Sequence, residues 1–209
     1  MDKIVVVGGG GHAKIVISIL KKMNKYKIIG YTDNKNKGDL LGIPYLGSDD
    51  ILIDLRYRNI KNAVLGIGHL DSSKIRVKIY HNLLDLEYSY PAIISPDALI
   101  SEDTSIGMGT VVVDGAVINT GVEIGEFSII NTNSSIDHDC RIGNFVHIAP
   151  GVTLSGGVSV GDYTFVGAGS VVIQNISIKG HCTIGAGAVV NKDIITKGTY
   201  IGKPAKKIK

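Results

Sequence analysis

The chain has 209 residues, a formal net charge of +3 and a composition that is 44% hydrophobic but only 6% aromatic, with no tryptophan. So small a charge gives no reason to expect nucleic acid as a partner. The apolar run that follows Met1 is too short for a signal peptide, and no stretch is long enough to span a bilayer. We therefore expect a cytoplasmic protein of one or two domains with an aliphatic core.

The first 91 residues have the pattern of a small α/β domain with parallel strands. An apolar run at 3–7 predicts a buried strand, and a glycine-rich turn then leads into an amphipathic helix. Further strands are predicted at 27–31 and 63–67, and a second helix at 72–84. The carboxyl ends of parallel strands share one edge of a sheet, where such sheets bind ligands. We expect the ligand of this domain at that edge.

The glycine-rich turn at 8–13 fits the dinucleotide spacing G-x-G-x-x-A, and Asp33 follows about 20 residues later. We predict a single nucleotide rather than NAD, because about 90 residues form only one mononucleotide-binding half and no dehydrogenase domain follows. The N–H groups of Gly10 and Gly11 would approach a diphosphate at the positive end of the helix, where His12 would donate to a phosphate or ribose. In the alternative, the glycines only permit close packing and His12 lies on the surface.

From Ile94 to Val190 an aliphatic residue recurs at every sixth position, and all are Ile or Val except Leu154. A period of six fits neither a helix nor a plain strand, but it fits a strand that turns a corner every six residues. Three sides would make a coil with a period of 18, and stacked coils would bury the aliphatic ladder. Some glycines are also 18 apart, namely Gly107, Gly125, Gly143 and Gly161. We expect these glycines to supply the unusual backbone angles of the corners.

A dense polar cluster at 131–140 interrupts the otherwise bland coils. His138 lies two residues after the inward Ile136, so its side chain should point outward. An imidazole near its ordinary pKa is mostly neutral in the cytoplasm and can accept a proton from an amine or hydroxyl that attacks a thioester. Asp137 and Asp139 flank it, and either carboxylate would orient the ring. The alternative is a solvated surface histidine.

Several motifs together resemble one family over essentially the whole chain. They are GGGGHAK at 8–14, the aspartate that ends the second strand, the aliphatic hexads and IGKPAK at 201–206. The chain resembles the hexapeptide-repeat sialic acid O-acetyltransferases (NeuD) and UDP-4-amino-sugar N-acetyltransferases (PglD). The resemblance implies an α/β half-Rossmann domain at 1–91 that binds a nucleotide-linked sugar. It also implies a left-handed parallel β-helix at 92–209 that binds acetyl-CoA, in a homotrimer with active sites between neighbouring chains.

The resemblance assigns roles to single residues as well. His138 inherits the role of general base and Asp139 that of its partner. The residues implied for the acyl donor are Asn131, His147, Gly156, Ala168 and Ala186, with the Gly156 N–H expected to hold the oxyanion. Those implied for the nucleotide-linked sugar are Gly10, Gly11, His12, Asp33, Asn34 and Gly68. A surface position without function is the alternative for His147.

We therefore predict an acetyl-CoA-dependent N-acetyltransferase. It would acetylate the 4-amino group of a UDP-, dTDP- or GDP-linked 4-amino-4,6-dideoxy sugar for lipopolysaccharide or capsule synthesis, by direct attack and without a metal. The alternatives are O-acetylation of sialic acid, a nucleotide-sugar-binding protein without activity, and a zinc hydratase of the carbonic anhydrase kind. The coil histidines His138, His147 and His181 are nine and thirty-four residues apart, a spacing from which a tetrahedral zinc site is hard to build.

Overall fold

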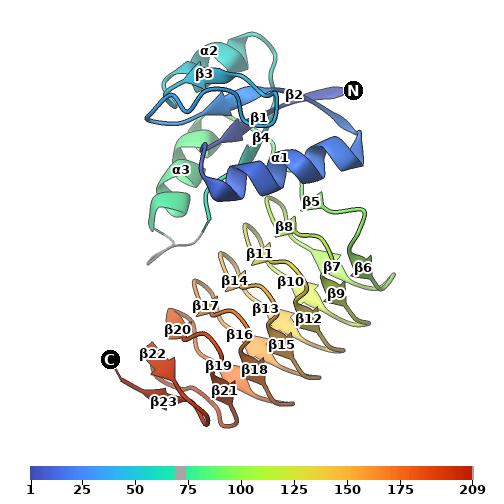
Figure 1. The fold of residues 1–209 in the computed structure, drawn as a ribbon, viewed down its shortest axis with the longest axis vertical. Helices are drawn as coiled ribbons and strands as arrows, with labels where there is room; N and C mark the ends of the chain where they lie inside the picture. The colour runs from blue at the N-terminus through green and yellow to red at the C-terminus, as the bar shows by residue number, and fades with distance from the viewer. Residues whose placement is uncertain (69–73, 209) are drawn as a thin grey trace. The chain divides into compact units, whose positions relative to one another are not determined.

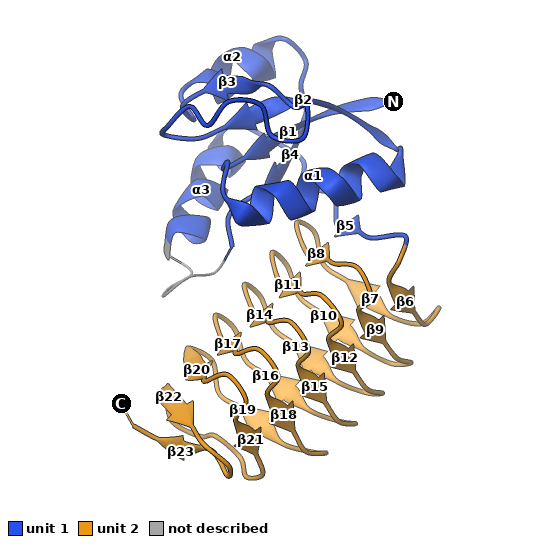
Figure 2. Ribbon diagram, viewed as in Figure 1, with its two compact units in different colours: residues 1–96 blue, residues 97–209 orange. Residues whose placement is uncertain are grey.

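The computed structural model describes residues 1–68 and 74–208, and the chain divides into two compact units, Met1–Pro96 and Asp97–Lys209 (Figure 2). Within the described ranges, none of the helices has the length and apolar character of a bilayer-spanning segment.

The first unit is a parallel four-stranded sheet with helices (Figure 1). Its elements are β1 (Asp2–Val7), α1 (Gly11–Met23), β2 (Tyr26–Thr32), β3 (Tyr45–Gly47), α2 (Ile51–Tyr57), β4 (Asn62–Leu65), α3 (Lys74–Asp85) and β5 (Ile93–Ile94), of which β5 lies outside this sheet. The sheet order is β3-β2-β1-β4, and all three pairings are parallel. The predicted strands are confirmed within two residues, whereas β3 and α2 were not predicted. Ser72 and Ser73, the expected start of the second helix, lie outside the described residues.

Helix α1 forms because its apolar residues fall on one face. Ala13, Val16, Ile17 and Leu20 are buried, and the two lysines of its last turn complement the negative end of the helix. Asn24 ends the helix in the left-handed conformation, and its N–H donates to the Leu20 carbonyl. At its other end, the helix begins at Gly11, directly in the glycine-rich turn.

The second unit is a parallel β-helix of very short strands. They are β6 (Leu99–Ile100), β7 (Ser105–Ile106), β8 (Val111–Val112), β9 (Val117–Ile118), β10 (Glu123–Ile124), β11 (Ile129–Ile130), β12 (Ser135–Ile136), β13 (Arg141–Ile142), β14 (His147–Ile148), β15 (Thr153–Leu154), β16 (Ser159–Val160), β17 (Phe165–Val166), β18 (Val171–Val172), β19 (Ser177–Ile178), β20 (Cys182–Ile184), β21 (Val189–Val190), β22 (Gly198–Ile201) and β23 (Lys206–Lys207). Ile124 pairs with Ile142, and Ile136 with Leu154, so the coils have the predicted period of 18.

Three sheets form the sides of the coil. One runs β19-β16-β13-β10-β7, a second contains β20-β17-β14-β11-β8, and a third runs β21-β18-β15-β12-β9-β6. Every ladder residue from Val112 to Val190 is buried, as predicted. Ile100 and Ile106 are only half-buried because they lie in the first coil of this unit, at the end of the stack.

The predicted corner glycines do not have the expected role. Gly107, Gly125, Gly143 and Gly161 lack a positive φ, so the expectation was wrong. They permit close approach instead, since a Cβ on Gly107 would lie 2.6 Å from the Gly125 carbonyl carbon. The left-handed residue comes three positions after each ladder residue, from Gly109 to Gly187, and at many corners it is not glycine.

The turns between the sheets stack into three corners, which we name by one residue each. The Phe127 corner contains 107–109, 125–127, 143–145, 161–163 and 179–181. The Ala168 corner contains 113–115, 131–133, 149–151, 167–169 and 185–187. The His138 corner contains 101–103, 119–121, 137–139, 155–157 and 173–175. The six-stranded sheet with β12 joins the Ala168 corner to the His138 corner.

Candidate active site

His138 lies on a corner turn between β12 and β13, and its side chain is 57% exposed, as predicted. Its Nδ1 is 2.8 Å from the Asp139 Oδ2 atom. Asp139 is therefore the carboxylate that orients the ring. A carboxylate accepts a hydrogen from Nδ1, so the neutral ring carries its hydrogen there and keeps a lone pair on Nε2.

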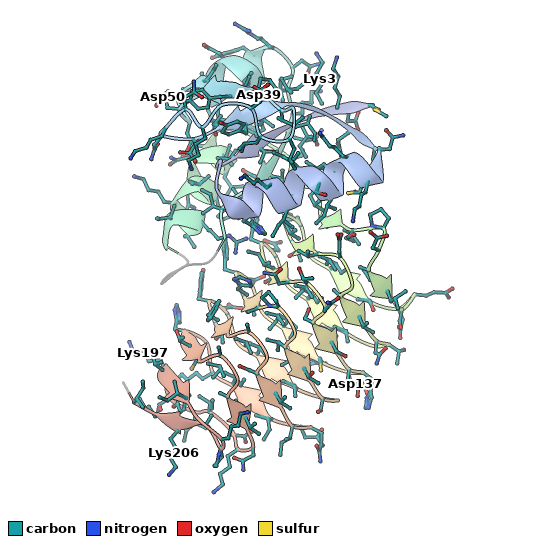
Figure 3. All side chains as sticks on the ribbon, in the orientation of Figure 1. Lys3, Asp39, Asp50, Asp137, Lys197 and Lys206 are labelled. Carbon is teal, nitrogen blue, oxygen red and sulfur yellow. The ribbon has the colours of Figure 1, made fainter. Side chains whose placement is uncertain are left out.

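Asp137 makes different contacts. Its Oδ1 accepts hydrogen bonds from Asn119 Nδ2 at 2.9 Å and from the His138 backbone N–H at 2.9 Å. Figure 3 shows Asp137 on the outer edge of the coils. The Asp139 hydrogen bond and then the Asp137 charge raise the pKa of His138, while the Asn119 hydrogen bond lowers the pKa of Asp137. Both neighbouring aspartates therefore favour the protonated form of the imidazole.

Gly156 lies one coil beyond His138 along the chain. A Cβ at this position would lie 2.6 Å from both Cε1 and Nε2 of His138. The neighbouring Gly157 N–H donates to the His138 carbonyl at 2.9 Å. Glycine at 156 therefore leaves room for the ring and places bare main chain against its basic nitrogen.

Asn131 and His147 form a second, buried group. Each is 9% exposed, and Asn131 Nδ2 lies 3.1 Å from His147 Nε2. Asn131 Oδ1 accepts the Thr132 N–H at 2.8 Å, which leaves the NH₂ group to donate to His147. The neutral His147 ring consequently carries its hydrogen on Nδ1. The Phe165 ring packs edge-on against the His147 ring, with 5.2 Å between the ring centroids. The surface alternative for His147 is wrong because the side chain is buried.

Ala168 and Ala186 are exposed and stacked, and the Gly187 N–H donates to the Ala168 carbonyl at 2.8 Å. Three of the four left-handed glycines of this corner, Gly151, Gly169 and Gly187, have nothing within 4 Å of an added Cβ, whereas the Asn133 side chain covers Gly115. At the His138 corner, in contrast, a Cβ added to Gly157 would lie 2.5 Å from the Oδ1 atom of Asn175. The Ala168 corner thus offers an uncovered main-chain surface.

Within one chain, the predicted transfer residues form two separate groups. His138, Asp139 and Gly156 lie together at the His138 corner. Asn131, Ala168 and Ala186 lie at the Ala168 corner, and His147 lies next to it on β14. One side of the prism, the sheet that contains β12, separates the groups. Of the predicted acyl-donor residues of a chain, only Gly156 therefore lies beside the candidate base of that chain, and the other four lie across this sheet.

The glycine-rich turn of the first unit has two kinds of glycine. Gly8 has a φ of +107°, and a Cβ there would lie 2.4 Å from Ile67 Cγ1. A Cβ on Gly9 would lie 2.6 Å from the Tyr31 ring. Gly10 and Gly11 have nothing within 4 Å. The first two glycines thus serve packing, whereas the next two leave the helix N-terminus open.

Asp33 braces this turn. Its Oδ2 accepts the Gly9 N–H at 2.9 Å and Lys37 Nζ at 2.9 Å, and its Oδ1 accepts the Lys35 N–H at 3.0 Å. Burial raises the pKa of Asp33, but these hydrogen bonds outweigh burial and the net pKa is lowered. Asn34 is exposed beside it. Sequence reasoning missed Lys37, whose only signal was its position four residues after the aspartate.

His12 lies in the first turn of α1, and its Nε2 is buried without a hydrogen-bond partner among the described residues. Burial and then the Arg76 charge lower the pKa of His12 to about 3, so the ring is neutral. A Cβ on Gly68 would lie 3.6 Å from His12 Cβ, which places the two residues side by side. The side chain is half-buried with its Nε2 atom enclosed, so His12 is not a fully exposed surface residue. The buried Arg76 carried no sequence signal, because charged residues are normally exposed.

Comparison with known proteins identifies the family to which this chain belongs. The family model of the PglD N-terminal domain matches residues 3–83, and that of the bacterial transferase hexapeptide (six repeats) matches residues 121–156. A mutant of perosamine N-acetyltransferase from Caulobacter crescentus, in complex with CoA and GDP-perosamine, is 35% identical with a TM-score of 0.94, over 100% of this chain and 98% of that one. The chain belongs to the PglD/NeuD family of acetyl-CoA-dependent sugar acyltransferases.

Other members of the fold agree with this assignment. The acetyltransferase domain of PglB from Neisseria gonorrhoeae, in complex with acetyl coenzyme A, is 33% identical with a TM-score of 0.91, over 99% of this chain and 98% of that one. WeeI from Acinetobacter baumannii, 24% identical with a TM-score of 0.84 over 100% of both chains, shows the same fold. A comparison with curated protein sequences found no match. The coils are thus the left-handed parallel β-helix of hexapeptide repeats, as predicted.

Proposed function

We propose that this protein transfers the acetyl group of acetyl-CoA to the 4-amino group of a nucleotide-linked 4-amino-4,6-dideoxy sugar. The observation that carries the proposal is the His138 ring, whose Nδ1 is held by Asp139 while its Nε2 faces the main chain at Gly156. Supporting it, the chain is similar along its whole length to an N-acetyltransferase solved with CoA and GDP-perosamine. UDP, dTDP and GDP remain the candidate carriers.

The reaction follows from these positions. The amine attacks the thioester carbonyl carbon, and His138 Nε2 accepts the proton that the nitrogen loses. Asp139 stabilises the imidazolium, and the Gly156 N–H stabilises the oxyanion of the tetrahedral intermediate. The carbon–sulfur bond then breaks, the His138 imidazolium gives its proton to the sulfur, and CoA leaves as the thiol. Acetyl-CoA is therefore a co-substrate, and no covalent enzyme intermediate is needed.

We propose residues 1–91 as the nucleotide-sugar domain. The open N–H groups at Gly10 and Gly11 lie at the positive end of α1, where a diphosphate is favoured. The neutral His12 beside Gly68 would donate one hydrogen bond, and exposed Asn34 would contact the base or ribose. Asp33 acts mainly by holding the turn, since its carboxylate already accepts three hydrogen bonds.

Residues 92–209 then form the acyltransferase domain, and we propose a homotrimer. His138 lies at one of the two corners that bound a sheet, and Asn131, Ala168 and Ala186 lie at the other. If neighbouring chains pack along this sheet, the base of one chain lies beside these acyl-donor residues of the next chain. The outward positions of this sheet are all uncharged, namely Leu99, Val117, Ser135, Thr153, Val171 and Val189. The five-stranded sheet instead carries Glu123 and Arg141 outward. An uncharged face is the one expected at a permanent interface.

The trimer is tested by paired charge substitutions. We expect Val171→Lys, on the uncharged sheet, to lower the mass measured by light scattering and to abolish transfer, because it introduces an ammonium into the interface. Ser159→Lys, on the five-stranded sheet, is the matched control and should leave both unchanged. A wild-type monomer with full activity would contradict the shared site.

The same proposal includes a role in lipopolysaccharide or capsule synthesis and a cytoplasmic location. The location is supported by Cys140 and Cys182, which are free and buried, as expected where thiols stay reduced. O-acetylation of sialic acid remains the second candidate, because a hydroxyl would use the same base. The nucleotide-binding turn favours the amine, since sialic acid without a nucleotide would leave that turn without a role. No group of three or more His, Cys, Asp or Glu in the described residues is arranged to hold a metal ion.

The decisive experiment measures thiol release from acetyl-CoA with a panel of UDP-, dTDP- and GDP-linked 4-amino-4,6-dideoxy sugars, and with sialic acid. We expect release with at least one nucleotide-linked amino sugar, inhibition by the matching free nucleotide, and loss of release in His138→Ala. Release with sialic acid alone would replace the proposal by the second candidate. Nucleotide binding without any release would indicate a binding protein.

A further inference from the structure

The second carboxylate of the His138 corner is held by a residue from another coil. Asn119 precedes Asp137 by one coil, and its Nδ2 donates to Asp137 Oδ1 at 2.9 Å. The same oxygen accepts the backbone N–H of His138 at 2.9 Å. One carboxylate oxygen therefore connects the Asn119 amide to the main chain of the candidate base.

The two aspartates have different tasks. Asp139 binds the ring at Nδ1, whereas Asp137 binds only the main chain of His138. Rotation of Asp137 about its side-chain bonds would release that N–H and move the negative charge away. Asn119 is the side chain that opposes this rotation, because its amide group is the second donor to Oδ1.

We propose that Asn119 is a positioning residue for acetyl transfer, which acts by holding Asp137 against the backbone of His138. The inference rests on the proposed role of His138 as general base. Two consequences follow. The turn keeps its geometry, so Nε2 stays directed at Gly156, and a second negative charge stays beside the imidazole.

The charge has a direct effect on the base. Among the described residues, the titratable groups around His138 are Asp137 and Asp139 from its own turn; the preceding coil presents Asn119 and Thr120 and the following coil Gly156, all uncharged. The Asp137 charge contributes to the raised pKa of His138. If Asp137 moves away, the ring is neutral at lower pH, so the acid limb of the kcat/KM profile shifts to lower pH.

The experiment distinguishes the loss of the Asn119 hydrogen bond from the loss of the Asp137 charge. Asn119→Ala removes the hydrogen bond to Asp137 and leaves Asp137 charged but free to rotate away from His138. The misplaced base should lower kcat about tenfold with an unchanged KM for acetyl-CoA. Asp137→Asn keeps an acceptor for both donors and removes the charge, which should shift the acid limb to lower pH. Thr120→Ala is the matched control, because it deletes an equivalent coil-to-coil bond, Thr120 Oγ1 to Asp103 Oδ2 at 2.7 Å, on the same corner. It should leave kcat and the profile unchanged.

A double-mutant cycle tests whether Asn119 acts through Asp137. In an Asp137→Ala background, Asn119→Ala should change kcat less than twofold, because the contact it supports is already gone. NMR titration of the His138 ring gives a readout that does not depend on turnover, and its midpoint should fall in both single variants. Thermal unfolding checks that every variant folds.

The outcomes distinguish this inference from the proposed function. If His138→Ala abolishes transfer but Asn119→Ala matches Thr120→Ala, or if its effect persists undiminished in the Asp137→Ala background, the positioning role is refuted. If His138→Ala itself retains full transfer, the proposed function fails first. A fall in kcat with an unmoved ring titration would reduce Asn119 to a purely structural residue, which also contradicts the inference.

Discussion

Two histidines, one in each unit, have opposite surroundings, and these surroundings shift their pKa values in opposite directions. His138 is exposed between Asp137 and Asp139, and the Asp139 hydrogen bond is the main cause of its raised pKa. His12 is half-buried near Arg76 with its Nε2 atom enclosed, and desolvation followed by the Arg76 charge lowers its pKa to about 3. The first ring is protonated more readily than an ordinary imidazole, whereas the second stays neutral. The coil histidine is therefore suited to accept a proton, and the turn histidine to donate a fixed hydrogen bond.

The largest effect expected from this contrast is on catalysis. His138→Ala should lower kcat by about 10²–10⁴-fold, because it removes the proposed general base, while the KM for acetyl-CoA changes little. His12→Ala should mainly raise the KM for the nucleotide-linked sugar. Steady-state kinetics of thiol release measures both. The comparison fails if the two variants show the same division between kcat and KM.

The space beside the base is the next test. Gly156→Ala would place a methyl group 2.6 Å from His138 Nε2, so the ring must move. We expect about a hundredfold loss of kcat, similar in size to the loss of one oxyanion donor. Gly156 has no positive φ, so the fold tolerates alanine. Ser155→Ala, one residue earlier, should retain activity; full activity in Gly156→Ala would argue against a catalytic role for this corner.

A smaller effect is expected on the free energy of unfolding, which should depend on pH through His12. His12 has a lowered pKa in the folded state and an ordinary value near 6.5 when unfolded, so only the unfolded chain gains a proton as the pH falls below 6.5. Stability is therefore lost on acidification, by about 2 kcal/mol at pH 5 from this group alone. Urea unfolding at pH 7.5 and pH 5 should show a difference that is about 2 kcal/mol smaller in His12→Gln. An equal difference in both proteins would show that His12 is not buried in solution.

The smallest effect expected is a shift in the pH profile. Asp139→Asn removes the main cause of the raised pKa of His138. Because the neutral ring is the active form, the acid limb of kcat/KM should move to lower pH, with about a tenfold fall of the plateau as the imidazolium loses its partner. The pH dependence of kcat/KM between pH 5 and 8 measures both. A shift to higher pH would contradict the assignment of Asp139.

Most of the β-helix was predictable because its six-residue repeat can be recognised within one continuous segment of the sequence. An inward aliphatic residue every six positions sets the side length, the size of the coil and the register together, and the ladder from Val112 onward is buried as expected. The corner glycines were misassigned because the spacing of 18 does not show which residue has a positive φ. Residues such as Phe127 and Asp139 take that conformation instead. In the first unit, β3 and α2 were missed because short elements carry little periodicity.

By itself, therefore, the sequence determined the coil, the outward position of His138 and the nucleotide-type turn, since each follows from spacing along one segment. Only the tertiary structure decided which atoms meet across the chain. It assigned Asp139 rather than Asp137 to the ring, and it joined Asn131 to His147 across 16 residues and Asn119 to Asp137 across 18. It also enclosed the Nε2 atom of His12 and brought Arg76 near this ring. Apart from the Asp139 contact, such contacts join residues that are distant along the chain, so they depend on how separate coils and elements stack and not on the spacing within one segment.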